Sequence, residues 1–104
     1  MKVEFDADDV KTMREALERW GLASQVGQAV EECAELIVAL QKYINREPRH
    51  EAAENILDEI ADVEIMLAQI RFALGISDDT LRERMSQKLN RVKSKYLNPP
   101  GTSS

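Results

Sequence analysis

The chain has 104 residues, a length that suits one domain with a modest core. Its hydrophobic fraction of 43% and charged fraction of 32% are typical of a globular, helix-rich protein. The net charge of −5 argues against a nucleic-acid-binding surface. No apolar run is long enough to predict a membrane span, and the first residues lack the apolar segment of a signal peptide. We therefore expect a cytoplasmic protein with neither a nucleic acid nor a membrane as partner.

Hydrophobic spacing predicts four helices and no strand. The first spans about 8–20 and ends at Gly21, the second runs from 22 or 24 to 44, and the third covers about 51–74 before Gly75. Residues 45–50 form a polar break that contains Pro48. Ser77 suits the N-cap of a fourth helix that reaches about 96. This pattern predicts a single all-α domain over 1–97 and a disordered C-terminal tail at 98–104.

The predicted third helix is apolar beyond its main stripe. Several apolar side chains lie off the face that carries the stripe, namely Ala61, Ile65, Met66 and Phe72. A helix that is hydrophobic most of the way round is usually buried on several sides. A chain of this size cannot cover such a helix alone, so we expect a homo-oligomer, most simply with two-fold symmetry.

Two short acidic motifs lie inside the second and third predicted helices. Glu32 and Glu35 are three residues apart, and so are Glu59 and Asp62. Residues at i and i+3 share one side of a helix, so two such pairs facing each other would gather four carboxylates. Oxygen ligands of this kind are what Mg²⁺ requires. Burying four like charges without a cation would be costly.

The phase of each motif relative to its hydrophobic stripe favours a metal site. On a helical wheel, Glu32 and Glu59 each lie at the edge of an apolar arc, and Glu35 and Asp62 each fall at roughly 300° from them. Both pairs therefore border their stripes on the same side, whereas Glu31 points away from the stripe. The alternative is that the motifs form two independent solvated acidic faces. In that case the protein would be a non-catalytic helical oligomerisation or regulatory module, and the acidic faces would only keep it soluble.

The sequence from Glu31 to Asp62 resembles the signature of the MazG-like, all-α nucleoside triphosphate pyrophosphohydrolases. The match covers roughly residues 22–96 and consists of E-E-x-x-E at 31–35, a 23-residue spacer, and E-x-x-D at 59–62. It implies a four-helix bundle that assembles as a homodimer or homotetramer. It also implies cleavage of nucleoside triphosphates between the α- and β-phosphates. Mg²⁺, or Mn²⁺ as a substitute, would be bound by Glu32, Glu35, Glu59 and Asp62.

Within this resemblance, Glu31 and Glu32 are the candidate catalytic residues. An ideal helix points Glu31 away from the stripe. It would act as a base behind the ligands or reach a neighbouring subunit's site. Lys88 and Arg91 match the family's closing motif, and they belong to a basic stripe on the fourth helix that also suits triphosphate binding. The alternative for this stripe is a solvated face near the helix C-terminus.

Three other side chains bear on the function or the fold. Trp20 and Gln25 are candidates for a nucleobase pocket, although Trp20 is more often a core or interface aromatic and Gln25 can simply be exposed. The lone Cys33 lies within a stripe and excludes an intrachain disulfide. A ferritin-like di-iron bundle needs Glu-x-x-His motifs on two of its helices. The one such spacing here, Glu47 to His50, contains Pro48 and lies in the predicted polar break, which disfavours that alternative.

Overall fold

The computed structural model describes residues 3–45 and 49–97, and this part of the chain is entirely helical, which confirms the all-α prediction. Four α-helices follow one another: α1 (Ala7–Trp20), α2 (Leu22–Ile44), α3 (Arg49–Leu74) and α4 (Asp78–Val92). A π-helical segment, Lys93–Leu97, extends α4, so the α-helix itself ends slightly before the predicted residue. Part of the predicted polar break, 46–48, and the whole predicted tail, 98–104, lie outside the described residues.

Local capping explains where the helices begin and end. Asp6 caps α1, because its side chain accepts from the Asp9 backbone N–H at 2.8 Å while the Asp9 side chain accepts from the Asp6 N–H at 2.9 Å. Ser77 caps α4 as predicted, accepting from the Thr80 N–H at 3.1 Å. Gly21, the residue between α1 and α2, has φ of 83°. Glycine adopts such positive values without the strain that a Cβ would introduce.

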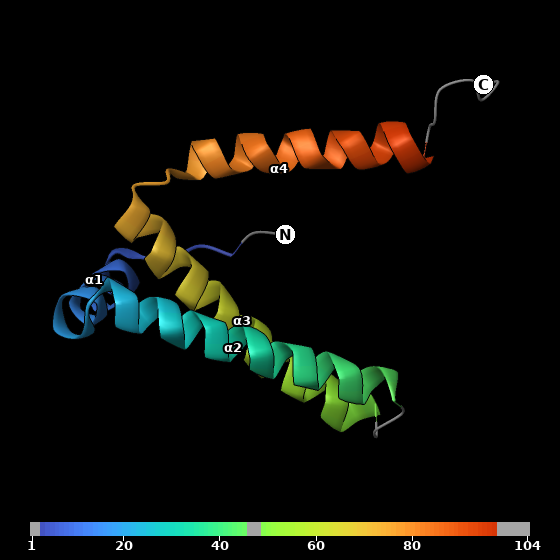
Figure 1. Ribbon diagram of the computed structural model, residues 1–104, viewed down its shortest axis with the longest axis horizontal. Helices are drawn as coiled ribbons and strands as arrows, with labels where there is room; N and C mark the ends of the chain where they lie inside the picture. The colour runs from blue at the N-terminus through green and yellow to red at the C-terminus, as the bar shows by residue number, and fades with distance from the viewer. Residues whose placement is uncertain (1–2, 46–48, 98–104) are drawn as a thin grey trace. The chain divides into compact units, whose positions relative to one another are not determined.

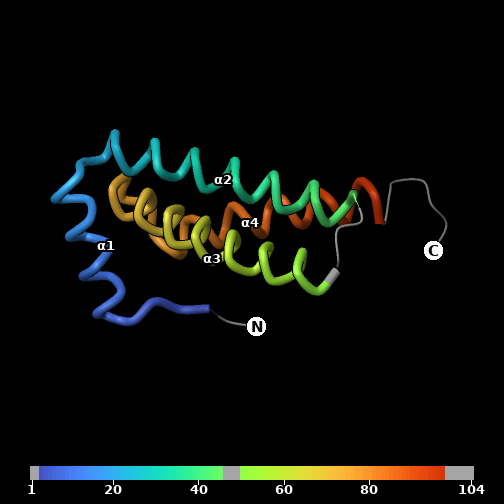
Figure 2. The backbone as a smooth tube through the Cα atoms, turned by 90° about the horizontal axis from the view of Figure 1, so that it is seen from below, coloured from blue at the N-terminus to red at the C-terminus, as the bar shows by residue number. Residues whose placement is uncertain are grey.

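The chain separates into two compact units, Met1–Leu74 and Gly75–Ser104, which are described in turn. In the first unit, α2 and α3 lie side by side and antiparallel along most of their length (Figure 1). Helix α1 contacts both of them, and Figure 2 shows it running across the end where α2 begins and α3 finishes.

The core of the first unit is made mainly of small side chains. The buried apolar residues among those described are Met13, Ala29, Ala39, Ala52, Met66 and Ala68. Alanine at a helix contact lets two backbones approach closely, but it buries little apolar area. Many large apolar side chains consequently remain exposed on α2 and α3, including Val30 (65% exposed), Ile37 (58%) and Leu57 (59%).

The second unit consists of α4 and its π-helical extension. Among its described residues, only Leu81 is half-buried, and the apolar side chains that follow it on the same face, Met85, Leu89, Val92 and Tyr96, are exposed. Within the described parts of both units, none of the helices combines the length and apolar character needed to cross a membrane.

Candidate metal centre

The α2–α3 pair packs through residues that alternate in steps of four and three. Between residues 25 and 39 of α2 and residues 52 and 70 of α3, the positions that follow this alternation are all buried or half-buried: Gln25, Ala29, Glu32, Leu36 and Ala39 on α2, and Ala52, Ile56, Glu59, Val63, Met66 and Ile70 on α3. We call these eleven residues the seam. Steps of four and three are the heptad spacing of two helices that pack side by side. Glu32 and Glu59 thus occupy seam positions that would ordinarily hold apolar side chains.

Three acidic side chains meet at this point of the seam. Glu32, Glu59 and Asp62 each place a carboxylate oxygen so that the three oxygens lie within 4.8 Å of one another. Glu32 and Glu59 are half-buried, while Asp62 is exposed at the edge. We call this group the carboxylate triad. Helix α2 supplies one carboxylate and α3 supplies two, so the group forms only when the helices pack.

The triad contains two oxygens that lack a partner. Oε2 of Glu32 and Oε2 of Glu59 are buried, and neither accepts a hydrogen bond within the described part of the chain. An unsatisfied buried acceptor costs about 1–3 kcal/mol, and more when it is charged. Repulsion between neighbouring carboxylates adds to this cost. A divalent cation would remove both penalties, because it would give the orphaned oxygens a ligand and neutralise their charge.

A neighbouring amide orients one of the triad carboxylates. Gln28, one turn before Glu32 on α2, donates from Nε2 to Glu32 Oε1 at 2.8 Å. This bond engages one oxygen and leaves Oε2 as the unpartnered one. Hydrogen bonds of this kind hold metal ligands in orientation in many proteins. Gln28 was not predicted as a site residue, although its i, i+4 spacing from Glu32 is a signal that the sequence carries.

The residues present fit a hard divalent cation. Adjacent ligands of an octahedral Mg²⁺ lie about 3 Å apart and opposite ligands about 4 Å, since each metal–oxygen distance is about 2.1 Å. The triad oxygens lie within 4.8 Å of one another, so they would draw closer together on binding one ion. All-oxygen donors suit Mg²⁺, Mn²⁺ or Ca²⁺ rather than Zn²⁺ or copper, which prefer nitrogen and sulfur ligands. Open positions would be completed by water or by phosphate oxygens, as is usual for Mg²⁺.

Two other residues of the predicted acidic set lie apart from the triad. Glu31 and Glu35 are both exposed on α2, and neither belongs to the group of carboxylates that the structure brings together. Cys33 is half-buried and has a free thiol. Of the four predicted metal ligands, the structure therefore gathers Glu32, Glu59 and Asp62.

The predicted phosphate-binding residues belong to the second unit. Lys88 and Arg91 are exposed on α4, and with Val92, Lys95 and Tyr96 they line a shallow hollow of about 230 Å³. Lys95 Nζ lies 5.4 Å from the centre of the Tyr96 ring, a distance suited to a cation–π contact. This part of α4 is an exposed cationic surface with an aromatic side chain at its edge.

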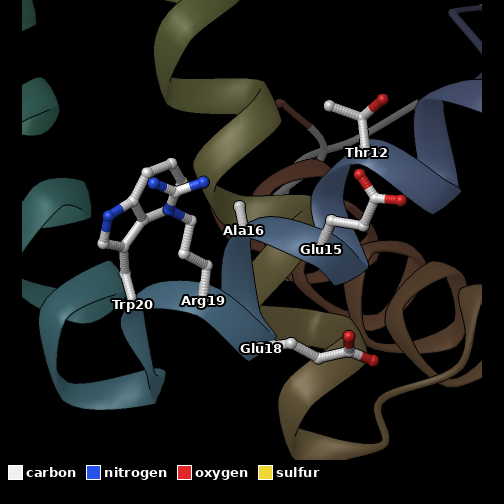
Figure 3. A pocket seen from close by; sticks show the side chains of 6 residues that line it. All are labelled: Thr12, Glu15, Ala16, Glu18, Arg19 and Trp20. Carbon is white, nitrogen blue, oxygen red and sulfur yellow. The ribbon is translucent and has the colours of Figure 1, made fainter.

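The predicted base-binding residues have different surroundings. Trp20 is 58% exposed at the end of α1, and the Arg19 guanidinium lies 5.5 Å from its ring centre. Figure 3 shows the two side chains next to each other in an open hollow of about 500 Å³ on α1. Gln25 is 7% exposed in the seam and accepts a hydrogen bond from Gln69 Nε2 on α3 at 2.5 Å.

Comparison with known proteins gave no match: no family model, no curated protein and no solved structure matches this chain. A function must therefore be inferred from the residues of the site and from the sequence motifs.

Proposed function

We propose that the protein is a Mg²⁺-dependent nucleoside triphosphate pyrophosphohydrolase that converts a (deoxy)nucleoside triphosphate to the monophosphate and pyrophosphate. The observation that carries the proposal is the carboxylate triad, with its two buried oxygens that have no hydrogen-bond partner in the described chain. The resemblance of residues 31–62 to the MazG-like signature supports the reaction type and the all-α scaffold.

In this proposal the triad residues Glu32, Glu59 and Asp62 hold the cation, and Glu35 on the exposed side of α2 is the fourth carboxylate. When bound, Mg²⁺ supplies Lewis-acid polarisation of the phosphate oxygens and lowers the pKa of a bound water. Gln28 keeps the Glu32 carboxylate oriented throughout. Mn²⁺ is the expected substitute, because it accepts the same oxygen ligands.

The remaining chemistry is assigned to the chain's own side chains. A water oxygen forms a bond to the α-phosphorus while the bond from that phosphorus to the bridging oxygen breaks, so pyrophosphate leaves. Glu31 accepts the proton that this water loses. It does so either as a base behind the metal ligands of its own subunit or by reaching the site of a neighbouring subunit. Lys88 and Arg91 bind the triphosphate through charge-assisted hydrogen bonds. Trp20 remains the candidate for contact with the base, whereas Gln25 is buried in the seam and paired with Gln69.

We also propose that the protein works as a homodimer or homotetramer. None of the large side chains described is less than 2% exposed, while Val30, Ile37 and Leu57 are each more than half exposed. Large apolar side chains that remain exposed together on a helical pair favour association. Light scattering at micromolar concentration should give a mass above that of one chain, 11.8 kDa. A monodisperse monomer would contradict this part of the proposal.

The same exposed apolar faces favour a second candidate function, a non-catalytic helical oligomerisation module. The two functions differ in one measurable respect. Purified protein should release pyrophosphate from at least one of the common NTPs and dNTPs when Mg²⁺ is added, and should not do so when the metal is chelated. Reaction in ¹⁸O-labelled water should place the label in the monophosphate, as attack on the α-phosphorus requires.

Matched variants test whether any activity belongs to this protein and this site. Asp62→Asn removes a triad carboxylate, and Asp58→Asn makes the same change at an exposed position one turn earlier on α3. We expect only Asp62→Asn to lose activity. If the parent protein releases no pyrophosphate from any nucleotide, the hydrolase assignment is wrong. If both variants retain full activity, the measured activity does not come from the triad.

A further inference from the structure

Two glutamines form a buried polar pair between α2 and α3. Gln25 and Gln69 are 7% and 5% exposed, and they are the buried polar residues of the described chain. Gln69 Nε2 donates to Gln25 Oε1 at 2.5 Å. Buried amides that pair with each other across two helices hold those helices at one relative position, because any other position leaves both amides desolvated and unpaired.

The amide pair and the carboxylate triad are spaced identically on the two helices. Glu32 follows Gln25 by seven residues along α2, and Gln69 follows Asp62 by seven residues along α3. Because the helices are antiparallel, seven residues carry both chains the same two turns, or about 11 Å, from the amide pair to the triad. One alignment of α2 against α3 therefore satisfies both groups.

The apolar side chains of the seam carry no polar group that would select that alignment. The buried ones are Ala29, Ala39, Ala52 and Met66, and the half-buried ones are Leu36, Ile56, Val63 and Ile70. Sliding one helix by a turn would still place apolar side chains against each other. It would also separate Glu32 from Glu59 and Asp62. A polar pair that penalises such a shift is a known way for helical pairs to fix their register.

We propose that Gln25 and Gln69 are positioning residues for the metal centre: their hydrogen bond fixes the α2–α3 register that brings the Glu32 carboxylate to those of Glu59 and Asp62. The inference rests on the metal centre of the proposed function and does not depend on the nucleotide chemistry. It assigns Gln25 a role inside the seam that differs from contact with a base.

The double variant Gln25→Met/Gln69→Met separates positioning from ordinary stabilisation. Methionine has nearly the length of glutamine and fills the same space without a polar group. Replacing both partners of a buried hydrogen bond by apolar groups is often neutral for stability, whereas replacing one leaves its partner unpaired. We expect the double variant to melt within a few degrees of the parent, and each single variant to melt about 5–10 °C lower.

The double variant should bind metal more weakly than the parent although its melting temperature is nearly unchanged. Titration of metal-free protein with Mn²⁺, followed by calorimetry and by the loss of the free-ion electron paramagnetic resonance signal, should show at least tenfold weaker binding for the double variant. The control Gln41→Met makes the same change on the exposed surface of α2 and should alter neither measurement. A double variant with parental stability but weakened Mn²⁺ binding supports the inference.

Two outcomes would overturn the inference. One is a folded double variant that binds Mn²⁺ as tightly as the parent. The second outcome applies if the double variant does not fold. In that case, a folded Gln69→Met protein with parental Mn²⁺ affinity would overturn the inference, because that single change also removes the hydrogen bond. A parent protein that binds no Mn²⁺ is a different result, because it refutes the metal centre itself and with it the proposed function.

Discussion

The candidate site residues of the α2–α3 pair are acidic, and those of α4 are basic. The acidic side chains are partly buried between two helices, whereas the basic ones are exposed. In the pair, Glu32 and Glu59 occupy seam positions, and their partnerless oxygens are buried. On α4, Lys88 and Arg91 form part of a stripe in which every side chain is exposed. Buried like charges need a specific counter-charge, whereas exposed cations are satisfied by water. Substitutions in the α2–α3 pair should therefore change activity and metal affinity strongly, and substitutions on α4 should change substrate binding modestly.

The steepest contrast is expected between two adjacent glutamates of α2. Glu32→Gln removes a triad ligand and should lower the hydrolysis rate by about a thousandfold or more, because a metal's charge stabilisation is worth several kcal/mol. Glu31→Gln removes an exposed carboxylate that we assign as a base, and should cost about a hundredfold. Initial rates at saturating Mg²⁺ measure both. Equal and severe losses would mean that the site is shared between subunits or holds a second metal.

Metal binding and stability should respond in opposite directions to a change at Glu59. Glu59→Gln keeps the shape of the side chain but removes a ligand and one of the crowded charges. We expect Mn²⁺ affinity, measured by calorimetry, to fall about a hundredfold, while the free energy of unfolding of metal-free protein rises by about 1 kcal/mol. The exposed Glu64→Gln on the same helix serves as the control. Parental Mn²⁺ affinity in Glu59→Gln would show that Glu59 is not a ligand.

On α4, the effects should be smaller and confined to substrate binding. Combined Lys88→Ala and Arg91→Ala should raise KM about tenfold and leave kcat within a few-fold, since exposed charge contacts contribute about 1 kcal/mol each at most. Steady-state kinetics over a range of salt concentration should show the difference shrinking as salt rises. Arg82→Ala, at another exposed position of α4, is the matched control. An unchanged KM would identify the basic stripe as a solvated surface.

The smallest effect tests whether the two units depend on each other. Ser77→Ala removes the N-cap of α4 and should cost that helix about 1 kcal/mol. Amide hydrogen exchange should report faster exchange in α4 and unchanged exchange in the α2–α3 pair, with Mn²⁺ affinity preserved. If Mn²⁺ affinity falls with the cap, the metal centre depends on α4 as well as on the pair.

The helix boundaries were predictable because their signals are local. Gly21 and Ser77 act through their own backbone and side chain, within one turn of the residues they cap. The position of Glu32 at the edge of the apolar stripe was also readable from the sequence, because it depends only on the phase of one helix. A single helix and its neighbours in sequence contain all of this information.

The sequence predicted only in part which carboxylates come together at the metal centre. Glu35 and Asp62 occupy equivalent places on their helical wheels, yet the structure brings Asp62 to the triad and leaves Glu35 exposed outside it. A wheel treats each helix alone, whereas the choice between two flanking carboxylates depends on how α2 lies against α3. For the same reason, the pairing of Gln25 with Gln69 was not predicted: no feature within either helix indicates which residue it will meet.

The triad draws its members from helices that are separated by a connection in the chain, so the unfolded polypeptide has no equivalent binding site. Any cation that binds there must therefore shift the folding equilibrium by mass action. Free Mg²⁺ at a hundred times the dissociation constant would add about 2.7 kcal/mol to the free energy of unfolding. For a protein whose buried apolar residues, among those described, are mostly alanine, that amount is a substantial share of the total. Ion supply would then govern how much of the protein is folded, in addition to how fast it works.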